Sequence, residues 1–151
     1  MKDKRGYQSK GYSNSDHNNK VFFEKEWIEE GISQKGLENV NTWCENDLAK
    51  SEVTTSKLRK FYGEVKRIQS IGVDSEKGRR AFMMLKPKLA YAVGRESKNY
   101  KFKQLYHFLE KGINHIAIDQ ADGDQLKKRF NNFTHVFEAI VAYHKFHGGK
   151  D

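Results

Sequence analysis

Residues 53–69 read VTTSKLRKFYGEVKRIQ, and the spacing of the apolar residues in this stretch indicates a helical fold. Its first turn contains hydroxyl side chains that suit the N-cap of a helix, at Thr54, Thr55 or Ser56. The apolar side chains that follow share one face, at the spacing i, i+3, i+4, i+7 and i+10: Leu58, Phe61, Tyr62, Val65 and Ile68. The stretch therefore predicts an amphipathic helix that packs through this face.

The opposite face of the predicted helix is cationic. At about 100° per residue it gathers four cations around a glycine: Arg59, Lys60, Gly63, Lys66 and Arg67. Glu64 is the one acid within the stretch after its first turn. Most charged helix faces are simply solvated, and that is the alternative interpretation. A face that serves only solubility usually mixes both signs, so this face instead indicates an anionic partner.

The composition of the chain favours one globular domain with an anionic partner. Ten Phe, seven Tyr and two Trp must supply much of the core, because hydrophobic residues make up only 36% of the 151 residues. Lys and Arg outnumber Asp and Glu by 28 to 20, which favours nucleic acid first and a membrane surface second. A single cysteine, Cys44, excludes an internal disulfide. With no secretory signal and no spanning apolar run, we expect a cytoplasmic protein without a membrane partner.

The pattern along the chain predicts an all-α fold, a compact bundle of five to six helices in a single domain over residues 21–147. Residues 1–20 are polar and basic, and such a composition cannot offset its own ordering entropy, so we expect a disordered N-terminal tail. No segment alternates with the period of a β-strand, and no internal repeat occurs. Short loops between helical patterns are typical of a helical bundle.

The helices before the basic stretch are short and acidic. Residues 21–32 form an amphipathic segment that we expect to dock as a first helix or turn, and Gly31 and Gly36 bracket a break. Residues 37–50 predict the second helix, with acids on its outer side: Glu38, Glu45 and Asp47. The acids confine positive potential to another part of the surface.

Residues 76–94, EKGRRAFMMLKPKLAYAVG, are apolar on most sides and predict a central helix that is packed by several neighbours. Met83 and Met84 are expected to fill the core. Pro87, the one proline, removes a backbone donor and is expected to kink or divide the helix.

The remaining patterns predict two further helices. The first covers residues 99–118, with inward side chains at Phe102, Leu105, Leu109, Ile113 and Ile116. The second covers residues 125–146, with inward side chains at Leu126, Phe130, Phe133, Phe137, Ile140 and Val141. Ser75 and Asp122 are the expected N-caps of the helices that follow them, and Gly148 and Gly149 are expected to end the last helix.

No pattern of residues predicts an active site. His144 and His147 lie at i, i+3, but a zinc site needs three or four ligands. Asp119, Asp122 and Asp124 lack the spacing of a calcium loop. The glycine-rich phosphate-binding motifs and the esterase motif are also missing from the sequence. We therefore predict no catalytic residues, no metal ligands and no cofactor.

Two stretches of the sequence carry a family resemblance. At residues 53–69, and again at residues 84–95, MLKPKLAYAVGR, the chain resembles the small subunit of the type III-A CRISPR effector, the Csm complex. The T-T-S-K-L-R core of the first stretch is the more specific motif. The resemblance covers roughly residues 37–143 and leaves the N-terminal tail outside.

The resemblance implies a non-catalytic subunit that stacks in more than one copy beside the backbone filament, which holds the guide RNA. Subunits of this family help position the guide–target duplex, mostly through phosphates of the target strand, in antiviral defence. Cutting of RNA and DNA and synthesis of cyclic oligoadenylate belong to other subunits. The implied partners are therefore guide RNA (crRNA), target RNA, the backbone and large subunits of the Csm complex, and neighbouring copies of the chain.

Lys and Arg contacts to phosphates give affinity without sequence information, as suits a complex in which base pairing reads the sequence. On the matching motifs, the predicted RNA-binding residues are Lys57, Arg59, Lys60, Lys66, Arg67, Lys86, Lys88 and Arg95. Arg79 and Arg80 lie outside the motifs and are second candidates. Two other interpretations stay open: a stand-alone helical nucleic-acid-binding regulator, and a protein–protein interaction module whose basic faces meet acidic surfaces.

Overall fold

The computed structural model describes residues 21–151, and the predicted tail over residues 1–20 lies outside this range. The helices, in chain order, are α2 (Lys25–Glu29), α3 (Gln34–Asn46), the 3-10 helix η1 (Leu48–Lys50), α4 (Thr55–Ile71), α5 (Glu76–Met83), α6 (Leu85–Gly94), α7 (Tyr100–Ile116) and α8 (Gly123–Phe146). The described residues form no strand, so the all-α prediction is confirmed. Because α5 and α6 lie end to end, residues 21–151 form a bundle of six helical rods.

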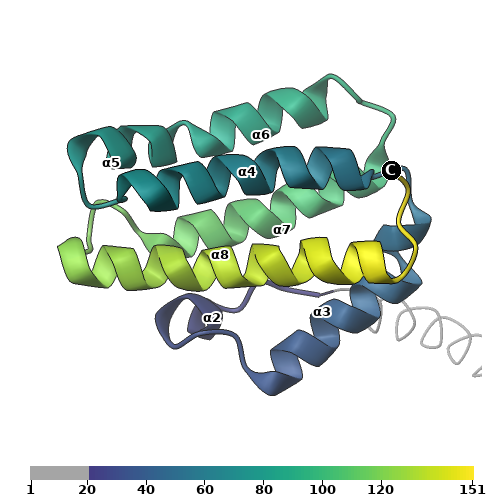
Figure 1. Ribbon diagram of the computed structural model, residues 1–151, viewed down its shortest axis with the longest axis horizontal. Coiled ribbons are helices and arrows are strands. Elements are labelled where there is room, and N and C mark those ends of the chain that lie inside the picture. Colours follow the sequence, from purple (N-terminus) through teal and green to yellow (C-terminus); the bar gives the residue numbers. More distant parts are fainter. Residues whose placement is uncertain (1–20) are drawn as a thin grey trace, which may run out of the picture.

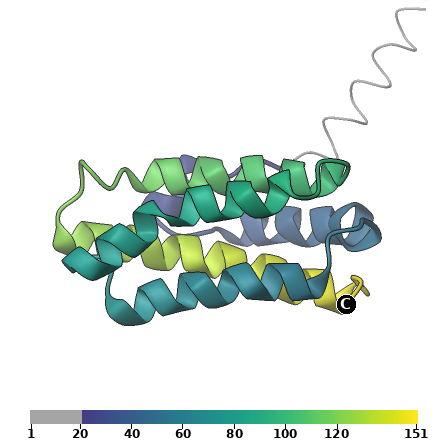
Figure 2. The same cartoon turned by 90° about the horizontal axis from the view of Figure 1, so that it is seen from above.

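Helix α8 lies at the centre of the bundle (Figure 1) and packs against α2, α3, α4 and α7. In Figure 1, α2 and α3 lie below α8, whereas α4, α5 and α6 lie above it. Helix α7 packs between α6 and α8. Figure 1 and the view from above in Figure 2 both place the C-terminal end beside the start of α4.

The inward faces predicted from helical spacing are largely confirmed. Every predicted inward residue of α4, α7 and α8 is buried except Tyr62 and Val141, which are half-buried. The predicted N-caps Thr54, Ser75 and Asp122 each accept a hydrogen bond from the backbone N–H three residues further on. These caps satisfy donors that the first turn of a helix otherwise leaves unpaired.

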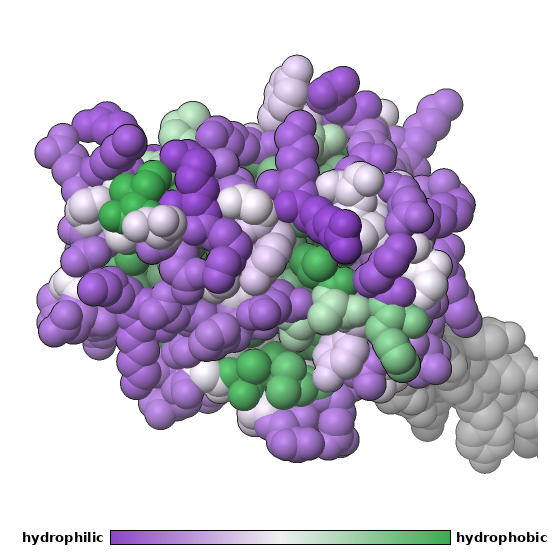
Figure 3. Space-filling model, viewed as in Figure 1, coloured by the Kyte–Doolittle hydropathy of each residue, from purple (hydrophilic) through white to green (hydrophobic). Residues whose placement is uncertain are grey.

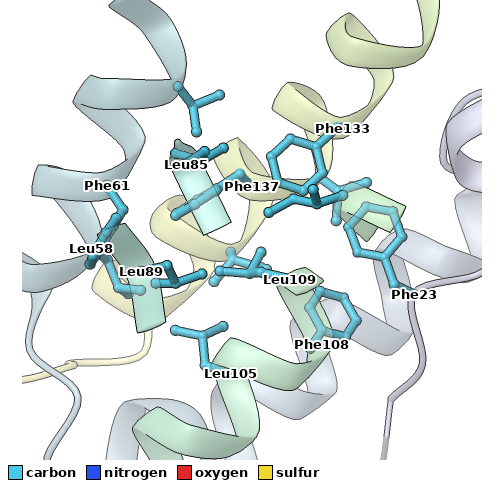
Figure 4. Close-up of a cluster of buried hydrophobic side chains, with 14 of the residues drawn as sticks. Phe23, Leu58, Phe61, Leu85, Leu89, Leu105, Phe108, Leu109, Phe133 and Phe137 are labelled. Carbon is cyan, nitrogen blue, oxygen red and sulfur yellow. The ribbon is translucent and has the colours of Figure 1, made fainter. Parts of the chain in front are cut away.

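Aromatic side chains form the centre of the core, as the composition predicts. The Phe23 ring stacks on the Phe133 ring with a centroid separation of 5.8 Å and lies 5.0 Å from the Phe108 ring. Figure 4 shows these rings in one cluster with leucines that come from α4, α6 and α7. Gly112 leaves the space that Phe23 occupies, since an added Cβ would lie 2.4 Å from its ring. One continuous apolar cluster therefore joins the segment before α2 to the later helices.

The prediction of a central helix over residues 76–94 is wrong. Helices α5 and α6 lie at the edge of the bundle (Figure 1), and one stripe of α6 packs inward, through Leu85, Leu89 and Val93. Met83 and Met84 are 59% and 49% exposed, so their assignment to the core is also wrong. Apolar residues around a whole helix here mark an exposed apolar surface rather than burial on all sides.

The predicted division at Pro87 is confirmed. Helix α5 ends at Met83, and α6 begins at Leu85 with Pro87 in its first turn. Proline has no N–H to donate to the carbonyl four residues earlier, which here belongs to Met83. The break therefore falls one turn before the proline, where that hydrogen bond would have continued the helix.

The predicted boundaries of the second helix also need correction. Gly31, with φ of 103°, lies in the break after α2, but Gly36 lies inside the first turn of α3. The Ser33 hydroxyl accepts a hydrogen bond from the Gly36 N–H at 3.0 Å, so the helix begins three residues earlier than predicted. At its other end α3 stops at Asn46, and η1 replaces the predicted last turn.

The residues after α8 return to the start of α4. The helix ends at Phe146, and Gly148, with φ of 84°, turns the chain back. The Thr55 N–H then donates a hydrogen bond of 2.6 Å to the carbonyl of Lys150. The start of the basic helix is therefore fixed by a segment nearly a hundred residues away.

Candidate nucleic-acid interface

Positive charge is concentrated in the middle of the chain. Residues 53–118 contain fifteen Lys and Arg but only five Asp and Glu, whereas residues 21–52 contain three against eight. The first set includes α4 to α7 and the second includes α2 and α3. Because α4, α5 and α6 lie on the opposite side of α8 from α2 and α3 (Figure 1), the bundle has a basic side and an acidic side.

Helix α4 presents three cations that are free to bind an anion. Its packing face is buried, so Arg59, Lys60 and Lys66 point to solvent and are exposed. Among residues 21–151, none of the three forms an ion pair or a side-chain hydrogen bond. The hydrogen bond from Lys145 lowers the pKa of the Asp151 carboxyl, and the charge of Arg59 adds a smaller effect.

Two other predicted cations share one carboxylate. The Arg67 guanidinium donates two hydrogen bonds to Glu64, of 2.8 and 3.2 Å, and the Lys88 ammonium donates another of 3.2 Å. The hydrogen bond from Arg67, with help from Lys88, lowers the pKa of the Glu64 carboxyl. Because Lys88 comes from α6, Glu64 joins α4 to α6.

The remaining predicted cations each have a different partner. Lys57 pairs with Glu96 at 3.2 Å, and Lys86 donates a hydrogen bond of 2.8 Å to the Asn114 side chain. The Arg95 guanidinium lies over the Tyr91 ring, 5.9 Å from its centroid, in a cation–π contact.

A groove between α4 and α6 brings part of the predicted set together. It has a volume of about 810 Å³ and is partly open to solvent. Four predicted RNA-binding residues line it: Lys57, Lys60, Lys88 and Arg95. The other lining residues are Phe61, Glu64, Met84, Pro87, Tyr91, Ala92, Glu96 and Phe102. This set of lining residues, called the α4–α6 groove below, combines cations at the rim with apolar side chains at the floor.

The other predicted residues lie outside the groove. Arg59, Lys66 and Arg67 are on the exposed surface of α4, and Lys86 is directed to α7 through its hydrogen bond with Asn114. The second candidates are engaged locally. Arg79 donates to the Ile118 carbonyl at 3.2 Å, and Arg80 pairs with Glu76 one turn earlier.

The family model described as Csm2 Type III-A matches residues 35–150 of the chain. The chain belongs to this family. The match covers both motif stretches and the helices from α3 to α8, so the family predicted from residues 53–69 and 84–95 is confirmed. No curated protein and no solved structure matches the chain significantly.

Membership of the Csm2 Type III-A family identifies the chain as a small subunit of the type III-A effector complex, which assembles with other Csm subunits. The family is one of structural small subunits. Within residues 21–151, no helix is both long enough and apolar enough to span a bilayer.

Sequence reasoning missed the aromatic and apolar part of the groove. Tyr91 is 70% exposed, and Met84 and Pro87 line the same groove. The spacing of Leu85, Leu89 and Val93 contained the signal, since a packing stripe at i, i+4 and i+8 leaves the other side of α6 exposed. The total apolar content of residues 76–94 obscured this stripe.

The two histidines considered as metal ligands have separate structural partners. His144 is buried and hydrogen-bonds the Val53 carbonyl at 2.8 Å, whereas His147 hydrogen-bonds the Asn41 side chain. In the described part of the chain, no three His, Cys, Asp or Glu side chains are grouped so as to hold a metal ion.

Proposed function

We propose that this chain is a non-catalytic, RNA-binding subunit of the type III-A complex, which contacts the phosphates of guide (crRNA) and target RNA through its basic side. In this role it stacks with neighbouring copies beside the backbone filament and supports binding of target RNA in antiviral defence, in the cytoplasm. The observation that carries the proposal is the set of three exposed cations on α4 without acidic partners among the described residues: Arg59, Lys60 and Lys66.

The physical basis of the proposal is release of counterions. Each Lys or Arg that neutralises a phosphate releases condensed cations from the RNA, which favours binding at low salt and carries no sequence preference. A subunit of an RNA-guided complex needs this kind of affinity, because the guide reads the sequence by base pairing. Bases need not be contacted for this function.

The ion pairs rank the predicted residues. Lys57, Arg67 and Lys88 already neutralise Glu64 or Glu96, so their net attraction for a phosphate is reduced. The three exposed cations of α4 therefore supply most of the phosphate affinity in this proposal, and Arg95, directly after α6, adds to it. A chain that only positions RNA in this way leaves cutting to other subunits.

The proposal is tested with reconstituted effector complexes whose small subunit carries Arg59→Gln, Lys60→Gln and Lys66→Gln. We expect weaker target-RNA binding, and a slope of log K against log salt that is smaller by roughly 2.5, at about 0.7–0.9 for each of the three phosphates that the variant no longer neutralises. A filter-binding titration over a salt series measures both values.

A matched triple variant controls for net charge. Lys35→Gln, Lys127→Gln and Lys128→Gln remove the same charge from exposed positions on α3 and α8. This control is expected to bind target RNA with nearly the wild-type slope. Equal slopes for wild type, α4 variant and control would contradict the proposal, provided that all three assemble into the complex.

A further inference from the structure

We propose that the α4–α6 groove binds an unpaired nucleotide of single-stranded RNA, with the base against Tyr91 and the phosphate at Lys60 and Arg95. This inference rests on the proposed function, since it takes RNA as the anionic partner. It goes further because it assigns the binding of a base to a specific pocket. Phosphate contacts alone could be made by any RNA, paired or unpaired.

The floor of the groove is apolar and has the size of a small-ligand site. Phe61 and Phe102 are buried residues that line the groove, and Met84 and Pro87 line it at the start of α6. A volume of about 810 Å³ lies in the range of pockets that hold small organic molecules, roughly 300–1,000 Å³. A nucleoside fits such a space.

Tyr91 gives the groove a stacking surface. Its side chain is 70% exposed although it lies in a helix that offers an inward stripe, and the Arg95 guanidinium is held over its ring. Aromatic rings and guanidinium planes are the two groups on which unpaired RNA bases stack. Figure 3 shows a mostly hydrophilic surface with hydrophobic side chains exposed in separate patches, so an exposed apolar groove is a local feature.

The charge of the rim distinguishes between possible occupants. Glu96 and Glu64 already neutralise Lys57 and Lys88, whereas Lys60 and Arg95 have no acidic partner among residues 21–151. An apolar helix of a neighbouring protein would fill the floor but leave these two cations unneutralised. A nucleotide satisfies both parts of the site, because it pairs a planar apolar base with an anionic phosphate.

A paired RNA duplex does not fit the groove in the same way. Its bases are stacked inside the helix, and the narrow major groove of A-form RNA keeps side chains from their edges. A duplex can contact the cations of α4 through phosphates but leaves Tyr91 without a base. The groove is therefore matched to a nucleotide that has left the stack.

The test uses the purified full chain with two fluorescein-labelled RNAs of equal length, an oligouridylate single strand and a perfectly paired duplex. Tyr91→Ala is expected to weaken binding of the single strand by about 5- to 150-fold, the equivalent of the roughly 1–3 kcal/mol that one stacked base contributes. Binding of the duplex should change by less than about twofold, because its contacts are to phosphates. Fluorescence anisotropy measures both affinities.

Two variants make the result specific. Tyr91→Phe keeps the ring and should retain single-strand binding. Tyr100→Ala removes a tyrosine that is 69% exposed but does not line the groove, and it should bind both RNAs as the wild type does. Both tyrosines are so exposed that their loss leaves the core intact.

Three outcomes would overturn the inference. Unchanged single-strand binding by Tyr91→Ala would overturn the inference. If the same variant also assembled poorly with other Csm subunits, the groove would instead bind a protein segment. Equal weakening of both RNAs would also exclude a base-stacking role. A wild-type chain that binds neither RNA at low salt would overturn it as well. None of these results decides the proposed function, which is tested separately by the charge variants in the assembled complex.

Discussion

Replacing His144 by alanine should destabilise the bundle where α8 fixes the start of α4. The ring is fully buried, and its Nε2–H donates to the Val53 carbonyl at 2.8 Å. With the proton on Nε2, Nδ1 accepts a hydrogen bond from the Thr55 hydroxyl at 3.3 Å. Alanine removes both hydrogen bonds at once, so the Val53 carbonyl and the Thr55 hydroxyl lose their partner. It also leaves a cavity at a fully buried site.

The expected loss follows from these contacts. A buried donor or acceptor left without its partner costs about 1–3 kcal/mol, and a vacated core volume adds to that cost. We expect His144→Ala to lower the free energy of unfolding by about 3–5 kcal/mol, a large part of the roughly 5–15 kcal/mol that stabilises a typical domain. Urea unfolding followed by circular dichroism measures the loss. His135→Ala, at an exposed position of the same helix, should change it by less than about 0.5 kcal/mol.

The same histidine predicts a dependence of stability on pH. Burial lowers the pKa of His144 below its ordinary value of 6.5, and the nearby charge of Lys145 adds to this effect, although the hydrogen bond with Val53 opposes it. The unfolded chain therefore binds a proton more readily than the folded chain. The contribution of neutral His144 to the free energy of unfolding is complete above about pH 6.5. It is lost as the pH falls from there toward the pKa that His144 has in the folded chain. Unfolding curves between pH 8 and pH 5, on the order of one unit apart, should show a steeper loss for the wild type than for His144→Ala. A loss on mutation below about 1 kcal/mol, or parallel pH curves, would refute this account.

Three further substitutions test the basic surface and the core. Glu64→Gln removes the carboxylate that Arg67 and Lys88 share. Target RNA should therefore bind more tightly, and the slope of log K against log salt should be steeper by roughly 1.5. A slope below that of the wild type would contradict the ranking of the cations. Gly112→Ala places a Cβ 2.4 Å from a buried phenylalanine ring and should lower the free energy of unfolding by about 1–3 kcal/mol in urea titrations. Gly63→Ala, with no atom within 4 Å of the added Cβ, should instead raise it by about 0.5–1 kcal/mol, and equal effects at the two glycines would disprove the packing argument.

Helix α4 could be predicted from the sequence because the information is local. The hydroxyl cap at Thr54, the apolar stripe and the cationic face all depend on residues within a few turns of one another. The edge position of residues 76–94 could not be predicted in this way. Which apolar residues of α6 are buried depends on where α7 packs, and the composition of a helix does not contain that information.

For the candidate site, too, the sequence predicts what depends on nearby residues and not what depends on the packing of distant ones. Its eight cations follow from residue type on two motifs, and the structure brings four of them to one groove. The acids that neutralise Lys57 and Lys88 lie in other elements, at Glu96 and Glu64, so their effect depends on the packing of α4 against α6. The sequence indicates no role for Tyr91, because an aromatic residue in an apolar segment normally belongs to the core.

The ion pairs divide the cations of the basic surface into those with acidic partners and those without. Two ion pairs link α4 to the other side of the groove: Glu64 of α4 pairs with Lys88 of α6, and Lys57 of α4 pairs with Glu96 just after α6. Lys60 and Arg95 are left without acidic partners in the described part of the chain, at positions on those two sides. A uniform patch of mobile lysines would attract RNA equally well at low salt but would not hold a base. Two acids among the cations therefore lower the net charge of the groove and link its two sides, and in our proposal this arrangement allows Tyr91 to distinguish an unpaired nucleotide from a duplex.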